Sequence, residues 1–134
     1  MVNRRQIVLS VTAALALGAT LSFSPLAYAA SKAFDQKAFV AAQNAGKPIL
    51  LHITAPWCPT CRAQAPILAN LEATPRFKGM VVFSIDFDSK KDLLRALRVN
   101  QQSTLVVFKG KQEVGRSTGD TNAASIEELL GKAI

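Results

Sequence analysis

Trp57-Cys58-Pro59-Thr60-Cys61 is the stretch on which the reading of this chain depends, because it holds both cysteines of 134 residues. Pro59 suits the first turn of a helix, where its missing N–H leaves no hydrogen bond unmade. Cysteines three positions apart on a helical turn face the same way, about 5 to 6 Å apart at Cβ, which permits a disulfide. Unpaired N–H groups and the positive end of the helix dipole favour a thiolate at Cys58.

This pair is typical of a site for thiol-disulfide exchange. Cys58 attacks a substrate disulfide, and Cys61, one turn inward, resolves the mixed disulfide that forms. An inert disulfide is disfavoured, because so short a loop adds little loop-closure stability. Closed zinc coordination normally takes four protein ligands, and the chain offers two cysteines and His52, so we expect no metal site. Haem attachment requires a histidine directly after the second cysteine, where Arg62 stands.

Around the pair, apolar residues recur in runs that predict alternating helices and strands. Helical spacing and short β-branched runs are both present. Pro66 lies inside the second predicted helix and is expected to kink it. The order predicts an α/β domain with a mixed central sheet flanked by helices on both faces. The predicted helices cover residues 34–44, 59–73, 89–97 and 125–133, and the predicted strands cover 49–54, 80–87, 104–108 and 112–117.

Residues 1–29 follow the pattern of a secretory signal peptide. Arg4 and Arg5 precede a long apolar run, and a site of small residues ends at Ala29, so we predict cleavage there. The paired arginines also fit a twin-arginine signal, although the general secretory (Sec) route is favoured. An uncleaved anchor is the alternative, since the run approaches the length of a tilted span. We predict one domain over 30–134, periplasmic or otherwise extracytoplasmic, with no stable membrane insertion after cleavage.

The composition describes a globular chain with a basic surface. Apolar residues make up 49% and charged residues 19% of the chain, which excludes intrinsic disorder. Loss of Arg4 and Arg5 with the leader lowers the formal net charge from +7 to +5. The basic residues are scattered, with no run longer than Lys90-Lys91, so we expect no nucleic-acid binding. About 105 residues suffice for one core, and we expect a monomer.

A set of short motifs follows in order along the chain. It comprises Phe39, Gly46-Lys47-Pro48-Ile49-Leu50-Leu51, Ala55-Pro56-Trp57-Cys58-Pro59-Thr60-Cys61, Ala65-Pro66-Ile67-Leu68, Ser84-Ile85-Asp86, Thr104-Leu105-Val106-Val107-Phe108-Lys109-Gly110 and Gly119. In this order the motifs resemble the thioredoxin family over nearly all of the predicted domain. The resemblance implies a thioredoxin fold with Cys58 as nucleophile, Cys61 as resolving thiol and Trp57 packed beside them. It also implies a substrate groove bordered by Gln102 and Thr104.

Ser103 departs from the family pattern, because thioredoxins usually carry a cis-proline at this position. A non-proline cis bond costs about 2.5 to 4 kcal/mol, so we expect a trans peptide and a reshaped substrate groove. We hypothesise that the Ser103 hydroxyl reaches the cysteine pair and alters thiolate stability or metal access. A tolerated replacement in a rearranged loop is the equally open alternative.

His52 is the second departure. Thioredoxins commonly place a buried acid here, beneath the resolving cysteine, and Val82 replaces the usual lysine partner of that acid. A neutral imidazole, with an unperturbed pKa of about 6.5, suits a group that accepts the proton of Cys61. A hydrogen-bonded strand histidine without a catalytic role is the alternative.

The resemblance implies an exported enzyme that reduces protein disulfides and needs no cofactor. Its substrates are protein disulfides or dithiols, and a membrane thiol relay is the expected electron donor, because the space beyond the cytoplasm is oxidising. A disulfide oxidase or isomerase remains open. A Cu(I)-binding or metallochaperone module is the alternative from another class, since Cu(I) accepts two soft thiolates such as Cys58 and Cys61.

Overall fold

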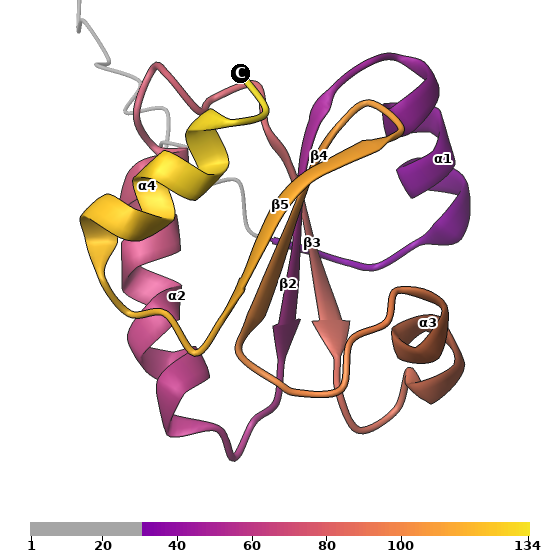
Figure 1. Ribbon diagram of the computed structural model, residues 1–134, viewed down its shortest axis with the longest axis vertical. Helices are drawn as coiled ribbons and strands as arrows, with labels where there is room; N and C mark the ends of the chain where they lie inside the picture. Colours follow the sequence, from indigo (N-terminus) through magenta and orange to yellow (C-terminus); the bar gives the residue numbers. More distant parts are fainter. Residues whose placement is uncertain (1–30) are drawn as a thin grey trace, which may run out of the picture.

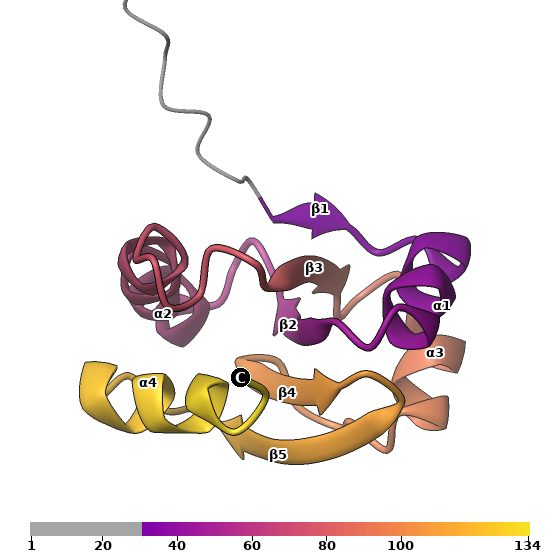
Figure 2. The ribbon, with the colours of Figure 1, turned by 90° about the horizontal axis from the view of Figure 1, so that it is seen from above.

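The computed structural model describes residues 31–134, which form a five-stranded sheet between two pairs of helices (Figures 1 and 2). Helices α2 and α4 cover one face of the sheet, and α1 and α3 cover the other. This confirms the predicted mixed sheet with helices on both faces. In chain order the elements are β1 (Lys32–Ala33), α1 (Gln36–Asn44), β2 (Pro48–Thr54), α2 (Pro59–Glu72), β3 (Val81–Asp86), α3 (Lys91–Ala96), β4 (Thr104–Lys109), β5 (Gln112–Thr118) and α4 (Ala123–Gly131).

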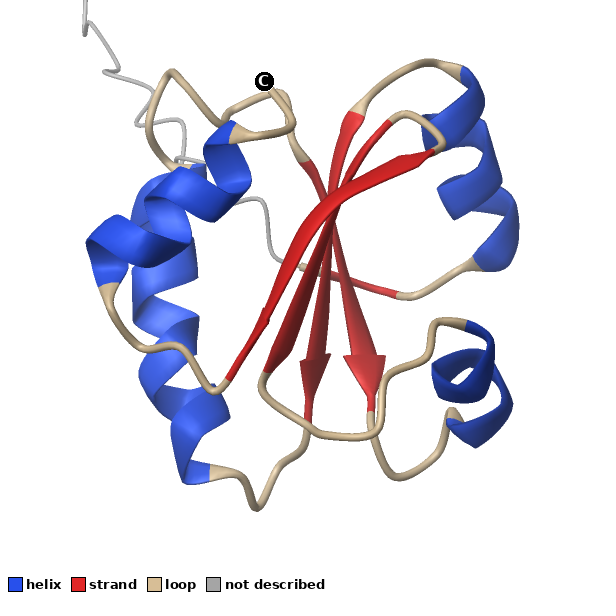
Figure 3. Cartoon of the chain, viewed as in Figure 1, coloured by secondary structure: helices blue, strands red, loops and turns tan. Residues whose placement is uncertain are grey.

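The strands, drawn red in Figure 3, lie in the order β1-β3-β2-β4-β5, which Figure 2 shows from above. The pairs β1·β3 and β2·β3 are parallel, whereas β2·β4 and β4·β5 are antiparallel, so the hairpin edge is antiparallel as predicted. Strand β1 was not predicted from the sequence. It has only two residues, both exposed, and is recognised by its pairing with β3, in which Ala33 lies opposite Ser84.

Three helix starts differ from the predicted positions, two of them because a side chain caps the helix. Helix α1 begins at Gln36 rather than at residue 34, because Asp35 accepts a hydrogen bond from the N–H of Ala38 at 2.7 Å. Asn122 caps α4 in the same way. Ser89, expected to open α3, instead donates its hydroxyl to Asp86, and α3 begins after Lys90.

Strand β2 divides the core between the two faces of the sheet. Its odd-numbered residues, Ile49, Leu51 and Ile53, pack with side chains of α1 and α3, whereas Leu50 packs with α2 and α4. Successive side chains of a strand alternate between faces, so His52 shares the face of Leu50. This alternation brings the histidine beneath the helix that carries the cysteines.

The predicted signal peptide, residues 1–29, lies outside the described residues. Within residues 31–134, no helix is both long enough and apolar enough to cross a bilayer.

Helix α2 continues through Pro66 to Glu72, although a proline there leaves one helical carbonyl without its N–H partner.

Glu72, the last residue of α2, is a poorly placed carboxylate. Half-burial raises its pKa from 4.5 to about 7. The negative end of the helix dipole also disfavours its charge, and the last turn has no basic residue to offset this. The folded protein therefore binds this proton more tightly than the unfolded chain does, and folding stability falls as the pH rises from about 4.5 to 7.

We predict that Glu72→Gln raises the free energy of unfolding at pH 8 by about 1 kcal/mol, after allowance for solvent screening, and leaves it unchanged at pH 4. Urea unfolding at both values measures this. Glu128→Gln, which alters an exposed residue of α4, is the matched control and should have no effect at either pH. An equal gain at pH 4 and pH 8 would contradict the electrostatic explanation.

Candidate active site

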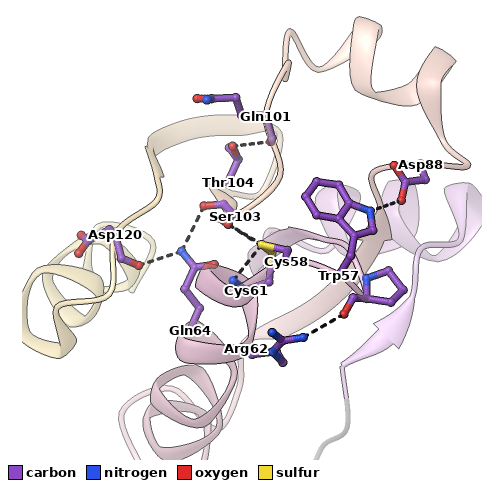
Figure 4. Close-up of a disulfide and its surroundings, with 11 residues drawn as sticks. Trp57, Cys58, Cys61, Arg62, Gln64, Asp88, Gln101, Ser103, Thr104 and Asp120 are labelled. Atoms are coloured by element: carbon purple, nitrogen blue, oxygen red, sulfur yellow. Dashed lines mark hydrogen bonds between the residues drawn. A yellow bond between two sulfur atoms is a disulfide. The ribbon is translucent and has the colours of Figure 1, made fainter.

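The two cysteines lie where the chain leaves β2 and begins α2 (Figure 4). Cys58 is the N-cap residue of α2, and Pro59 takes the first helical position. The two cysteines form a disulfide with a Cα–Cα separation of 5.3 Å. Sγ of Cys58 accepts a hydrogen bond from the backbone N–H of Cys61 at 3.0 Å. The start of α2 therefore stabilises negative charge on Cys58 when the disulfide opens.

Both sulfurs are covered, and the neighbouring indole is not. Cys58 and Cys61 are 1% and 3% exposed, whereas Trp57 is 54% exposed. The indole N–H of Trp57 donates to Asp88 at 2.7 Å, which holds the ring beside the cysteines (Figure 4). A large, fixed apolar surface next to the disulfide suits contact with another protein.

Ser103 lies directly against the disulfide. Its hydroxyl oxygen is 3.0 Å from Sγ of Cys58 and 3.2 Å from Sγ of Cys61. The described residues contain no cis peptide bond, so the bond before Ser103 is trans, as expected. The residue instead takes a left-handed conformation with φ 59°, which costs a non-glycine residue about 1 kcal/mol. The hydroxyl thus reaches the cysteine pair, and its effect on their chemistry stays a prediction.

The loop that leads to Ser103 is held from the neighbouring hairpin. Arg98, at the start of this loop, is also left-handed, with φ 55°. The guanidinium of Arg116, on β5, donates to the carbonyls of Leu97 and Arg98, both at 3.2 Å. At the other end of the loop, the N–H of Gly119 donates to the Ser103 carbonyl at 2.9 Å.

Gln64 is a site residue that the sequence analysis missed. It lies one turn after Cys61 on α2 and is completely buried. Its amide Nε2 donates to the carbonyls of Ser103 at 3.1 Å and Asp120 at 2.8 Å. The signal in the sequence was a lone amide among the apolar residues of the inner helix face.

His52 is buried on β2, opposite Ser84 on one side and Leu105 on the other. Burial lowers the pKa of the imidazole, and the nearby side chain of Gln64 raises it to a smaller extent. That contact is not a formed hydrogen bond, since among residues 31–134 neither Nε2 of His52 nor Oε1 of Gln64 has a partner within hydrogen-bonding geometry. His52 is therefore held in its neutral form near neutral pH.

A cleft of about 720 Å³ lies on the side of Cys61 that faces β1 and β3. Both Cys61 and His52 line it, which brings the predicted proton acceptor and the predicted resolving thiol to one space. Charged side chains are among its lining residues. The other lining residues are Ser31, Ala33, Phe34, Thr54, Ala55, Pro56, Arg62, Ala65, Ser84, Asp86 and Lys90.

The two predicted groove residues differ in placement. Gln102 is partly exposed beside Ser103. Thr104 is 3% exposed, and its hydroxyl donates to the Gln101 carbonyl at 2.8 Å and contacts the Thr118 hydroxyl at 3.0 Å. The Thr104 side chain is thus engaged in the fold, and its place in a substrate groove stays a prediction.

Comparison with known proteins agrees with this geometry. A family model described as Thioredoxin matches residues 27–132. Thioredoxin H-type from Fagopyrum esculentum is 34% identical over 94 residues, which cover 70% of this chain and 76% of that protein. Thioredoxin from Mycobacterium tuberculosis is 31% identical over 91 residues, which cover 68% of this chain and 78% of that protein. The crystal structure of Trxlp from Edwardsiella tarda has a TM-score of 0.72 and 38% identity, covering 75% of this chain and 97% of Trxlp.

We predict that Ser103→Ala makes the reduction potential of the Cys58–Cys61 couple more negative by about 30 mV. In the reduced protein the hydroxyl can donate to a thiolate, and a hydrogen bond to a charged group contributes about 1.5 to 3 kcal/mol. Its loss should shift the equilibrium with glutathione about tenfold towards the oxidised protein. Ser103→Gly removes the hydroxyl without left-handed strain and should give the same shift. An unchanged potential in both variants would rule out a tuning role.

Proposed function

This chain belongs to the thioredoxin family, and we propose that it is an exported thiol-disulfide oxidoreductase that reduces disulfide bonds in other proteins. The observation that carries the proposal is Cys58 at the helix N-cap, where its Sγ meets the N–H of Cys61, with Cys61 one turn behind it. This arrangement supplies a stabilised thiolate and a second thiol within reach of the same sulfur.

The reaction starts from the reduced pair. The Cys58 thiolate attacks one sulfur of a substrate disulfide, the other substrate sulfur leaves as a thiolate and takes a proton, and a mixed disulfide remains. Cys61 then loses its proton and attacks Sγ of Cys58. The second substrate thiol is released, and the Cys58–Cys61 disulfide forms. Two electrons and two protons have passed to the substrate, and a dithiol donor must return them.

His52 is the proposed acceptor for the proton of Cys61. Burial keeps the imidazole neutral, Nε2 has no hydrogen-bond partner in the described part of the chain, and both residues line one cleft. A neutral imidazole with a free nitrogen can take a proton, whereas a protonated one cannot. The thiolate of Cys61 is needed only in the second step, so His52 should act on resolution and not on the first attack.

The proposal includes an extracytoplasmic location, supported by the arginine pair, apolar run and small-residue site of residues 1–29. The oxidising conditions outside the cytoplasm would then require a membrane thiol relay as donor. Sequencing the amino terminus of the protein isolated from its host tests the location. A chain that begins at Ala30 is the expected result, and a chain that begins at Met1 in the membrane fraction would overturn it.

Insulin reduction in the presence of dithiothreitol tests the activity. The wild-type protein should turn over, and Cys58→Ser should abolish turnover because it removes the nucleophile. Cys61→Ser, reduced first and then mixed with insulin after the dithiothreitol has been removed, should accumulate a mixed disulfide visible on a non-reducing gel, because neither Cys61 nor a free dithiol resolves it. Failure of Cys61→Ser to trap any substrate would contradict the assigned order of the two cysteines.

Two further measurements separate the alternatives. Tight binding of Cu(I) by the reduced pair, together with no insulin turnover, would favour the metal carrier. Within residues 31–134 no three His, Cys, Asp or Glu side chains gather into a metal site, so such a carrier would depend on the two thiolates alone. Titration of the couple against glutathione separates a reductase from an oxidase or isomerase, because a strongly reducing value supports reduction.

We predict that His52→Leu slows resolution of the mixed disulfide at pH 7 by about 100-fold, the lower range for loss of a general base, and leaves the first attack unchanged. Single-turnover reduction, followed by the fluorescence of Trp57, the only tryptophan of the chain, resolves the two steps. His52→Gln fills a similar volume without titrating and should be equally slow. If both variants resolve the mixed disulfide at the wild-type rate from pH 5 to pH 9, the proton-transfer role is excluded.

A further inference from the structure

We propose that Gln64 is a positioning residue that holds the Ser103 hydroxyl against both sulfurs and presents its amide oxygen to His52. The inference rests on the proposed thiol-disulfide chemistry, because it concerns how the reduced pair is stabilised. The inference assigns a role to a residue that lies outside the C-x-x-C motif and is not adjacent to it in the sequence. Gln64 acts through Ser103 and His52, and its own hydrogen bonds go to backbone carbonyls rather than to the sulfurs.

The buried amide of Gln64 joins three separate parts of the chain. The residue is on α2, and its Nε2 donates to Ser103, before β4, and to Asp120, between β5 and α4 (Figure 4). Asp120 is itself fixed, because its carboxylate accepts hydrogen bonds from the N–H of Asn122 and the hydroxyl of Ser125. Both amide hydrogens of Gln64 are thus used on carbonyls of restrained loops.

Ser103 needs this support because its backbone conformation is unfavourable for a residue with a side chain. Its carbonyl accepts two hydrogen bonds, one from Gln64 at 3.1 Å and one from the N–H of Gly119 at 2.9 Å. Together they fix the peptide that follows the left-handed residue. The Cα–Cβ direction of Ser103 then follows from the backbone, and it aims the hydroxyl at Cys58 and Cys61. Removal of one bond lets the residue relax away from the sulfurs.

The amide oxygen of Gln64 and the imidazole of His52 both belong to buried side chains. Oε1 of Gln64 and Nε2 of His52 are both buried, and neither finds a hydrogen-bond partner among the residues that the structure describes. Gln64 favours the protonated form of His52, in opposition to burial. If Nε2 receives the proton of Cys61, it becomes a donor, and a small movement lets it bond to Oε1. Both unpaired atoms would then be satisfied during the step in which Cys61 attacks.

Gln64→Met tests the proposal, because methionine fills a similar volume and has no N–H donor. In the reduced protein, we expect thiolate formation at Cys58, followed by absorbance at 240 nm, to need a pH about one unit higher. The equilibrium with glutathione should shift about tenfold towards the oxidised protein, as in Ser103→Ala. Combined with Ser103→Ala, Gln64→Met should add less than twofold to either shift, because both changes remove the same contact.

Asn70→Met is the matched control, since Asn70 is an exposed amide on the same helix and should leave both measurements unchanged. Gln64→Asn keeps the amide but is too short to reach both carbonyls, so it should shift both measurements in the same direction even if the methionine variant does not fold. Unchanged values in the Gln64 variants, or full additivity with Ser103→Ala, would overturn the proposal. Both readouts need no protein substrate, so a failure of insulin reduction would count against the proposed function alone.

Discussion

The hydrogen bond from the N–H of Cys61 to Sγ of Cys58 is the interaction on which the rest of this site depends. It exists because β2 delivers the chain to the first turn of α2, where backbone N–H groups have no helical partner. Pro59 starts the helix without using a donor, and Cys58 caps it with sulfur in place of the usual oxygen. The remaining groups act on a sulfur whose preference for negative charge is already set by the backbone.

Ser103 brings a hydroxyl to both sulfurs, at the position where the thioredoxin pattern carries a proline. A proline restrains its own backbone, whereas Ser103 is left-handed and must be restrained by others. Arg116 holds the start of the loop, and Gln64 and Gly119 hold its end. The site therefore gains a polar contact to both sulfurs, but the conformation of the loop that carries Ser103 then depends on residues distant in the sequence.

Periodicity predicted most of the fold because each long element buries one face. The four helices and four of the strands were expected within a few residues, since apolar spacing of 3.6 and 2 survives in the sequence. Helix starts were less accurate where a side chain had two possible partners. The Ser89 hydroxyl could cap a helix, but it donates a hydrogen bond to the Asp86 carboxylate instead. Only the geometry of the turn decides which of these two hydrogen bonds forms. Strand β1 is too short to show any period.

The sequence by itself determined the cysteine pair, its place at a helix start and the fold around it, because these follow from local spacing and from the order of motifs. Tertiary structure alone decided which groups surround the sulfurs. Ser103 is more than 40 positions from the cysteines, and Gln64 makes its contacts with loops that precede β4 and α4. Such contacts have no period along the chain. They arise only when the sheet places the start of β4 beside the start of α2, and the chemistry of the pair depends on them.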